Sequence, residues 1–489
     1  MKKVLIVVAL LVATLAALPF YSGYRVEQEL QKVVDAVNDY PGYEASLEDY
    51  SKGWLSSSGT LKINFTVVAP GNTGATPEPE DLGLPVEFNV DHGPLLFNDI
   101  ATVGWFSYRS SISQELLNSA NSNDGQFTLI DAEHLMFGSG YANLAGDMQF
   151  NSEIAKFNYA DQSSDVEFNV DFGGASGNGS LARNGLIDFD LAIGSLKFKN
   201  SKEDYITVAS STLAGSGDYS KVVSNSLYPS EFVFIIPKVD GRVEGKPLLF
   251  EKFTMAAEIT FSEADPVFSM LMDASLAKGS VDGQEVSDAD LSISYDNISF
   301  AIYDSYMKYT EAMLQDPASQ PDFTQLFSEE DIKEALIYNP GFSIHNLQAT
   351  VPDGNLQGSM KVAIQPLQDF DLATVFQKPE VLINMTTVNL NMSGDKPLVH
   401  KMMEPKIRQD IEVQLAVLEA QGQPQNMTLE EVDNLVETSV VATIQQLSQQ
   451  GLVVEENDQY VTSFSLIAGN AKVNGVDFPL DALMGGIKQ

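Results

Sequence analysis

Residues 59–65 read Gly-Thr-Leu-Lys-Ile-Asn-Phe, and this short stretch indicates the fold of the chain. Its Leu, Ile and Phe alternate with Lys and Asn, the period of two that puts apolar side chains on one face of a β-strand. Residues 194–198 and 358–362 begin similarly, with Gly, Ser and an apolar-Lys-apolar triplet. Because the spacing is not fixed, no repeat array is predicted. Similar strand entries and chance resemblance both stay open.

Strand signals of this kind recur between Asn, Asp and Gly turn residues. Since no regular helices separate most of them, antiparallel β is favoured over β-α-β units. Pro70–Pro85 is predicted to be an exposed loop, and the glycine-rich run Gly173–Gly179 a flexible turn. The predicted strands are residues 86–90, 127–130, 166–170, 187–193, 206–209, 232–236, 291–298, 343–351, 359–364, 381–392, 460–467 and 471–476.

Helical periodicity is confined to a few segments. Tyr303–Leu314 and Glu329–Ile337 are predicted helices. Two stronger apolar stripes fill residues 398–450, and the second opens with a capping box at Thr428–Glu431. This pair predicts a helical hairpin on the concave face of a curved sheet. It is either a permanently packed core, or a cover over an apolar groove or a dimer contact. The candidate apolar contact residues are Met402, Met403, Val436 and Val440.

The chain begins with an apolar segment. Val4–Tyr24 holds 21 residues without a charge and follows Lys2 and Lys3. At about 1.5 Å per residue, a helix of this length crosses the ~30 Å hydrocarbon core of a bilayer. The lysines would stay in the cytoplasm and the rest would be exported. A helical continuation, Arg25–Asn38, would lead into the folded body.

Two interpretations of this segment stay open. A cleaved secretory signal needs a small-x-small site after a shorter apolar run. The best site, Ala13–Ala16, lies inside the run, which continues past Leu18. Tyr21 and Tyr24 suit an aromatic belt at the outer membrane interface. We therefore expect an uncleaved anchor that starts at Val4, with a cleaved signal as the alternative.

The chain is strongly acidic and has no cysteine. It has 67 Asp and Glu against 28 Lys and Arg, a net charge of −39. Binding to nucleic acid or broadly to anionic headgroups needs clustered cations, so neither is expected. Hydrophobic residues make up 44%, enough for a packed core. The lack of cysteine excludes thiol catalysis and thiolate metal sites.

No catalytic, cofactor or metal motif can be assigned. The four histidines, His92, His134, His345 and His400, have no partner at zinc spacing. Neither a Gly-x-Ser-x-Gly elbow nor a P-loop is present. Paired carboxylates could hydrolyse a glycoside, but 67 acidic residues do not single out a pair. We expect a non-enzyme without a cofactor, and an acidic-site hydrolase stays an alternative.

Two motifs stand out from the alternating background. Residues 50–57 read Tyr-Ser-Lys-Gly-Trp-Leu-Ser-Ser, with Tyr43 before them, and residues 90–94 read Val-Asp-His-Gly-Pro. Together with the anchor and the short helix after it, and with the close of the chain at Asn474–Leu480, they resemble the YdgA-like proteins of Gram-negative bacteria, a family largely of unknown function. The resemblance covers nearly the whole chain. The class is also distantly similar to AsmA-like envelope proteins, some of which are implicated in lipid traffic to the outer membrane.

The resemblance implies an inner-membrane protein that faces the periplasm. It also implies a homodimer as one candidate oligomeric state. It assigns no catalytic residue. In physical terms, Gly53 forms a turn that lets Trp54 bury beside the first strand, and Asp91 caps backbone amides in a second turn. Ligand contact by His92 is the functional alternative. The motif residues, interpreted as structural, are Tyr50, Gly53, Trp54, Asp91, His92, Gly93 and Pro94.

The sequence therefore predicts an α+β fold, mostly antiparallel β, with an N-terminal transmembrane helix and an elongated curved sheet that carries the hairpin. The expected parts are a cytoplasmic tail (1–3), an anchor (4–24), a β-rich periplasmic region (25–300) and an α+β periplasmic region (301–489). The expected function is a non-catalytic envelope protein that binds or passes a lipid or another envelope component. The alternative is a scaffold that binds protein partners through sheet edges.

Overall fold

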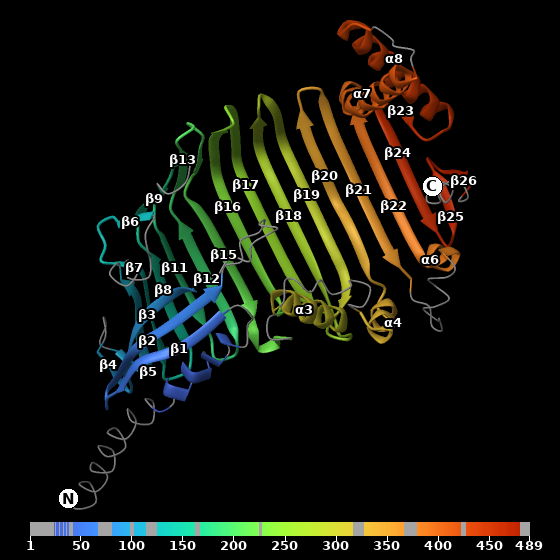
Figure 1. Ribbon diagram of the computed structural model, residues 1–489. Coiled ribbons are helices and arrows are strands. Elements are labelled where there is room, and N and C mark those ends of the chain that lie inside the picture. The colour runs from blue at the N-terminus through green and yellow to red at the C-terminus, as the bar shows by residue number, and fades with distance from the viewer. Residues whose placement is uncertain are drawn as a thin grey trace, which may run out of the picture. The chain divides into compact units, whose positions relative to one another are not determined.

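The computed structural model describes most of the chain from Tyr24 onward (Figure 1). The described residues are 24, 26–28, 30–32, 34–35, 37–38, 43–66, 81–97, 102–113, 125–161, 167–223, 227–315, 327–365, 379–421 and 427–479. Apart from Tyr24, the expected membrane anchor lies outside them. Within these ranges, no helix has both the length and the apolar character that a membrane crossing requires.

The chain divides into two compact units. The first comprises Met1–Leu248 and Asp304–Leu326, and the second comprises Leu249–Tyr303 and Phe327–Gln489. Both consist mainly of antiparallel strands with a few helices, which confirms the predicted fold class at that level.

The first unit is built from antiparallel strands that pair along two paths. One path of pairing is β1-β2-β3-β5-β7-β8-β11-β12-β15-β16, and a second is β6-β9-β10-β13-β14-β16. The strands are β1 (Tyr43–Lys52), β2 (Ser56–Thr66), β3 (Asp81–His92), β4 (Leu95–Leu96), β5 (Thr102–Ser113), β6 (Gly125–Leu129), β7 (His134–Asn143), β8 (Met148–Ile154), β9 (Phe157–Asp161), β10 (Phe168–Phe172), β11 (Ala175–Leu181), β12 (Leu186–Ile193), β13 (Leu196–Asn200), β14 (Tyr205–Val208), β15 (Ser211–Asp218) and β16 (Ser230–Val243), with a 3-10 turn η1 (Tyr219–Lys221).

The second unit is also an antiparallel sheet, and it adds helices. Its strands pair in the order β18-β19-β20-β21-β22-β24-β25-β26, and β23 pairs with β24. The elements are β17 (Lys246–Phe261), β18 (Val267–Val281), β19 (Gln284–Ser299), α3 (Phe300–Gln315), α4 (Glu329–Ile337), β20 (Gly341–Val351), β21 (Gly354–Ile364), α6 (Pro379–Met385), β22 (Thr386–Asp395), α7 (Lys396–Ala420), α8 (Leu429–Gln449), β23 (Val454–Glu456), β24 (Gln459–Ile467), β25 (Asn470–Val473) and β26 (Val476–Phe478).

Several predicted boundaries change. The predicted loop at residues 70–85 ends earlier, because β3 already begins at Asp81 and includes Pro85. The predicted strand 381–392 is helix α6 up to Met385 and strand only from Thr386. The predicted helices at 303–314 and 329–337 are confirmed as α3 and α4, and the capping box at Thr428–Glu431 is present at α8.

Four long strands of the first unit are interrupted at one level. The breaks separate β8 from β9, β11 from β10, β12 from β13 and β15 from β14, and each contains two residues. Hydrogen bonds continue across them, from Gly173 N to Ser195 O (2.7 Å) and from Gly194 N to Gly174 O (2.6 Å). A Cβ at Gly194 would lie 2.4 Å from the Gly173 carbonyl, so only glycine fits there. The prediction of a flexible turn over residues 173–179 is wrong, because Gly173 and Gly174 form a break and β11 follows.

The helical residues before β1 are fastened to the first unit. Val26 and Val34 are buried. The Asn38 side chain holds the Ala45 backbone twice, accepting from its N–H (2.6 Å) and donating to its carbonyl (3.1 Å). The segment that follows the apolar start of the chain is therefore docked on the sheet.

The hairpin α7–α8 contacts the sheet of the second unit at the ends of strands, not across a face as expected. Lys401 Nζ lies 2.6 Å from Asp353, in the turn between β20 and β21. A Cβ at Gly394, near the end of β22, would lie 3.0 Å from the Val399 side chain. Figure 1 shows α7 beside these strand ends. The apolar stripes of the two helices pack mainly on each other, around Val436 and Val440.

Candidate functional site

A row of alternating aromatic residues and glycines crosses seven strands of the first unit. Each member is the direct cross-strand partner of the next. The row consists of Tyr108 (β5), Gly140 (β7), Phe150 (β8), Gly179 (β11), Phe189 (β12), Gly215 (β15) and Phe232 (β16). We call it the aromatic–glycine row.

Each of three rings in this row lies over the glycine of the following strand. A Cβ built on Gly140 would lie 2.6 Å from Tyr108 Cε1, and one on Gly179 would lie 2.4 Å from Phe150 Cζ. At Gly215 the corresponding distance to Phe189 Cζ is 2.7 Å. These glycines therefore provide room for rings that lie along the sheet, an arrangement that covers the bare backbone of a glycine with an aromatic face.

Two further rows flank it on the same face, since side chains two residues apart on a strand point the same way. Together the three rows contain no charged side chain, and we call them the apolar face. One flanking row is Phe106, Ala142, Met148, Leu181, Ile187, Gly217 and Ser230; the other is Ser110, Gly138, Ser152, Gly177, Leu191, Leu213 and Phe234.

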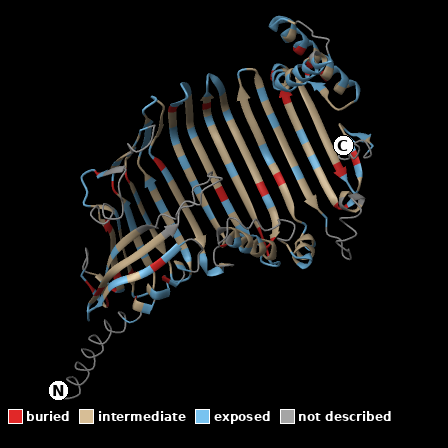
Figure 2. Ribbon diagram, viewed as in Figure 1, coloured by how far each residue is buried: buried red, intermediate tan, exposed pale blue. Residues whose placement is uncertain are grey.

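The residues between these rows face the other side and are mostly polar, with Ala214 and Val233 as exceptions. On β12, Asp188 and Asp190 alternate with Ile187, Phe189 and Leu191. Both aspartates are exposed, while the three apolar side chains are half-buried. An apolar face under a second layer would be fully buried. Figure 2 shows few fully buried positions on the long strands, so the described part of this face stays partly open.

Tyr108 begins the row and is its one titratable residue. Burial among its neighbours raises the pKa of its phenol above 10.0, because the charged form loses solvation. The ring thus contributes a neutral surface at physiological pH.

The second unit has an apolar row of its own that spans eight strands. The adjacent row of residues, which lies on the polar face of the sheet, includes Ser294, Ser343 and Lys361. The apolar row is Met272, Ile293, Ile344, Met360, Leu390, Phe464, Val473 and Val476. Each unit therefore carries a sheet with one apolar and one polar face.

The two motifs singled out in the sequence meet at β2 and β3. His92 Nε2 lies 3.1 Å from Ser57 Oγ, and His92 Nδ1 lies 3.4 Å from the Trp54 carbonyl oxygen. Both side chains are buried, with 1% of His92 and 2% of Ser57 exposed. Desolvation by burial lowers the pKa of His92 below 6.5, and the positive charge of Lys52 lowers it further. The hydrogen bond to Trp54 and the negative charge of Asp91 act in the opposite direction but are outweighed. His92 is therefore a neutral and buried side chain.

The motif residues differ from expectation in two places. Trp54 is 56% exposed, so the prediction of a buried ring is wrong. The tight turn in which Gly53 N donates to Ser56 O (2.7 Å) places Trp54 at its tip. Asp91 is not a turn residue, since it lies inside β3 opposite Ser56.

The remaining motif residues support this corner of the sheet. The Tyr50 hydroxyl is buried and has no hydrogen-bond partner in the described part of the chain, and its ring lies 6.4 Å from that of Phe88. Gly93 N donates to Trp105 O (2.8 Å), and a Cβ on Gly93 would overlap the Gly104 carbonyl oxygen. The turn that Gly93 and Pro94 form therefore requires a glycine.

The predicted contact residues of the hairpin fall into two groups. Val436 and Val440 are 2% and 1% exposed and lie with Ile411 in the hairpin core. Met403 packs against this core, while Met402 is 56% exposed. Only Met402 of these four is open to a partner in the structure.

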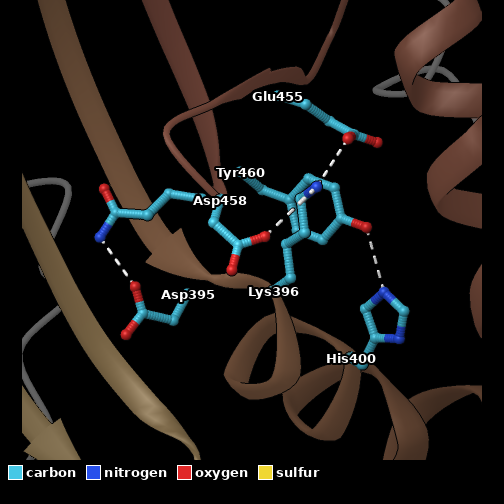
Figure 3. Close-up of polar contacts among 7 residues, drawn as sticks. Asp395, Lys396, His400, Glu455, Asp458 and Tyr460 are labelled. Carbon is cyan, nitrogen blue, oxygen red and sulfur yellow. Dashed lines mark hydrogen bonds and ion pairs between the residues drawn. The ribbon is translucent and has the colours of Figure 1, made fainter.

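A polar cluster connects the start of α7 to the β23–β24 hairpin (Figure 3). Lys396 Nζ lies 2.7 Å from Glu455, 3.7 Å from Asp458 and 5.7 Å from the centre of the Tyr460 ring. His400 Nε2 lies 3.1 Å from the Tyr460 hydroxyl, and the two rings stack.

Hydrogen bonds hold the charged groups of this cluster. The hydrogen bond to Glu455 raises the pKa of Lys396. Hydrogen bonds from Gln459 and the Asn355 backbone lower the pKa of Asp395. Such exposed pairs contribute little stability each. The cluster holds α7 against the strand ends, and its cation is already paired, so we assign it no ligand.

In the ranges that the structure describes, no group of three or more His, Asp or Glu side chains could hold a metal ion. No curated protein and no solved structure matches the chain. A family model, that of a bacterial protein of unknown function (DUF945), matches residues 1–481. Because the match covers nearly the whole length, the chain belongs to this family of bacterial proteins of unknown function.

Proposed function

We propose that this protein is a non-catalytic, inner-membrane-anchored envelope protein that faces the periplasm and binds the acyl chains of a lipid on the apolar face. The observation that carries the proposal is the half-buried aromatic–glycine row, flanked by rows without charge. Apolar area that stays in contact with water is costly, about 25 cal/mol per Å², so an apolar ligand would be stabilised there.

The position of this face in the chain favours a lipid over another apolar ligand. The uncharged segment Val4–Tyr24 directly precedes the helical residues that dock on β1 through Asn38. If the segment is an anchor, as its length suggests, the first unit follows the membrane immediately. The resemblance to YdgA-like and, distantly, AsmA-like envelope proteins supports the same location and ligand class.

The chemistry of the face is consistent with binding rather than reaction. Its side chains are aliphatic, aromatic, Gly or Ser, and the acidic residues of β12 lie on the opposite side. We infer that transfer of a lipid along the face would need no covalent step. The edge strand β1 could instead accept a protein partner, but its pairing is irregular between Glu48 and Ser51, a feature that discourages strand addition.

Photocrosslinking tests the proposal with a matched control. A photoreactive amino acid is placed at Leu191, on the apolar face, or at the adjacent Asp190, on the polar face. We expect the first site to capture lipid from membranes of expressing cells, and the second to capture several-fold less. Equal capture at both sites, or capture of protein alone at Leu191, would overturn lipid binding on this face.

A further inference from the structure

A polar pocket of about 330 Å³ lies in the first unit over β6, β9, β10 and β13. It is separate from the apolar face, which crosses other strands. Its polar lining comes from side chains that alternate with the aromatic residues of these strands. These side chains are Thr128, Asn158, Asn169, Asp171, Lys197 and Lys199.

Two lysines give the pocket positive charge, which is unusual in a chain with a net charge of −39. Lys197 and Lys199 are both exposed and lie two residues apart on β13, opposite Asp171 and Asn169. Side chains at this spacing share a face, with Cα atoms about 7 Å apart, so both ammonium groups can reach one ligand.

Two other lysines of the first unit pair with a carboxylate, whereas these two do not. Lys221 pairs with Asp218 at 3.2 Å, and Lys238 pairs with Asp240 at 3.6 Å. Within the described ranges, neither Lys197 nor Lys199 forms an ion pair with a carboxylate.

The single acid of the pocket is engaged by another residue. In the orientation that satisfies its hydrogen bonds, the Asn158 amide donates to Asp171 Oδ1 (3.1 Å) and to the Phe157 carbonyl (3.2 Å). This leaves two ammonium groups for a ligand against one hydrogen-bonded carboxylate. The net charge of −39 does not cancel them, because charges farther than the Debye length of about 8 Å are largely screened.

We propose that this pocket binds the phosphate group of a phosphate ester, with Lys197 and Lys199 as the cations and Thr128 and Asn169 as additional hydrogen-bond donors. A phosphate monoester carries up to two negative charges near neutral pH, which two ammonium groups match. The volume suits a polar head group, since ligand sites begin near ~300 Å³. The inference is independent of lipid binding on the apolar face.

Binding is measured by calorimetry with the full-length, detergent-solubilised protein in phosphate-free buffer, with glycerol 3-phosphate as the probe. We expect saturable binding, weakened about tenfold or more in Lys197→Gln/Lys199→Gln, because a hydrogen bond between charged groups is worth at least a factor of ten. The control Lys202→Gln/Lys221→Gln removes the same charge outside the pocket and should bind as the parent does. Absence of binding at millimolar probe, or equal weakening in both double variants, would overturn the proposal.

A second arm distinguishes a soluble ester from a lipid head group. Micelles doped with short-chain phosphatidylglycerol or with the matching diacylglycerol are compared. Lysine-dependent binding of phosphatidylglycerol alone identifies a head group as the source, and equal affinity for glycerol 3-phosphate identifies a soluble ester. Lipid binding that depends on neither the phosphate nor the two lysines would contradict phosphate binding in the pocket, and it would leave the proposal of lipid binding on the apolar face unaffected.

Discussion

At the scale of single residues, His92 shows how a buried motif residue joins neighbouring segments of the sheet. It has 1% of its surface exposed and joins the β2 motif to β3 through Ser57 and the Trp54 carbonyl. A buried polar side chain of this kind is stable because its ring nitrogens have partners. Its protonation is therefore coupled to folding.

The coupling has a definite sign. The pKa of His92 in the folded protein is lower than the 6.5 of an unfolded chain. As the pH falls through 6.5, the unfolded state takes up a proton first, so stability present above that pH is lost progressively below it. We expect the melting temperature of the parent to fall more between pH 7.5 and 5 than that of His92→Gln, which keeps polar atoms but does not titrate. Parallel losses in the two proteins would contradict this.

Residue patterns alone gave part of the site. The strands that carry Phe189 and Phe232 could be predicted because the period of two is local. Their pairing with glycines in β11 and β15 could not, since register depends on contacts between distant segments. Gly179 was predicted to lie in a turn because the run Gly173–Gly179 is rich in glycine. Trp54 was predicted to be buried because aromatic rings usually are, yet its position at a turn tip decides otherwise.

At the scale of elements, the aromatic–glycine row is a set of strand-to-strand contacts. Gly179→Ala would place its Cβ against Phe150, so we expect a loss of about 1–3 kcal/mol in unfolding free energy, the usual cost of overpacking. Gly358→Ala in β21 is the control, because its nearest neighbour would be 3.5 Å away.

A double-mutant cycle identifies the contact responsible. In Phe150→Ala the ring is gone, so adding Gly179→Ala should cost clearly less than it does in the parent. Urea unfolding of the four proteins measures the coupling. Strict additivity would show that the ring does not depend on the glycine.

The hairpin is an element whose stability comes mainly from itself. Its core unites α7 and α8 around Ile411 and Val440, and its links to the strand ends include exposed ion pairs such as Lys401–Asp353. We expect α8 amides to exchange hydrogen faster than those of β21, because exposed pairs add about 1 kcal/mol or less. Hydrogen exchange followed by mass spectrometry tests this. Protection of α8 equal to that of β21 would mean that the hairpin belongs to the sheet's cooperative core.

At the scale of the whole molecule, composition and periodicity were enough to predict an acidic, mostly antiparallel β protein. They could not show that each unit carries a sheet with one apolar and one polar face of which the apolar face of the first unit stays partly open, because alternating strands fit a covered sheet equally well. Helix α6 was missed because the chain changes period at Thr386 inside one apolar run. The hairpin was predicted correctly as two helices but placed wrongly, since amphipathic stripes do not say which surface they meet.

The aligned two-residue breaks in the first unit also restrict which insertions and deletions the strands can tolerate. Residues on either side of a break, such as Phe172 and Ala175, are three positions apart and yet both belong to the apolar pattern. Deletion of one residue at Gly173–Gly174 would move each side chain of β11 to the other face of the sheet. Asn178 would then lie on the apolar face and Gly179 on the polar face. Hence a viable change of length here must come in pairs, or occur in all four strands at once.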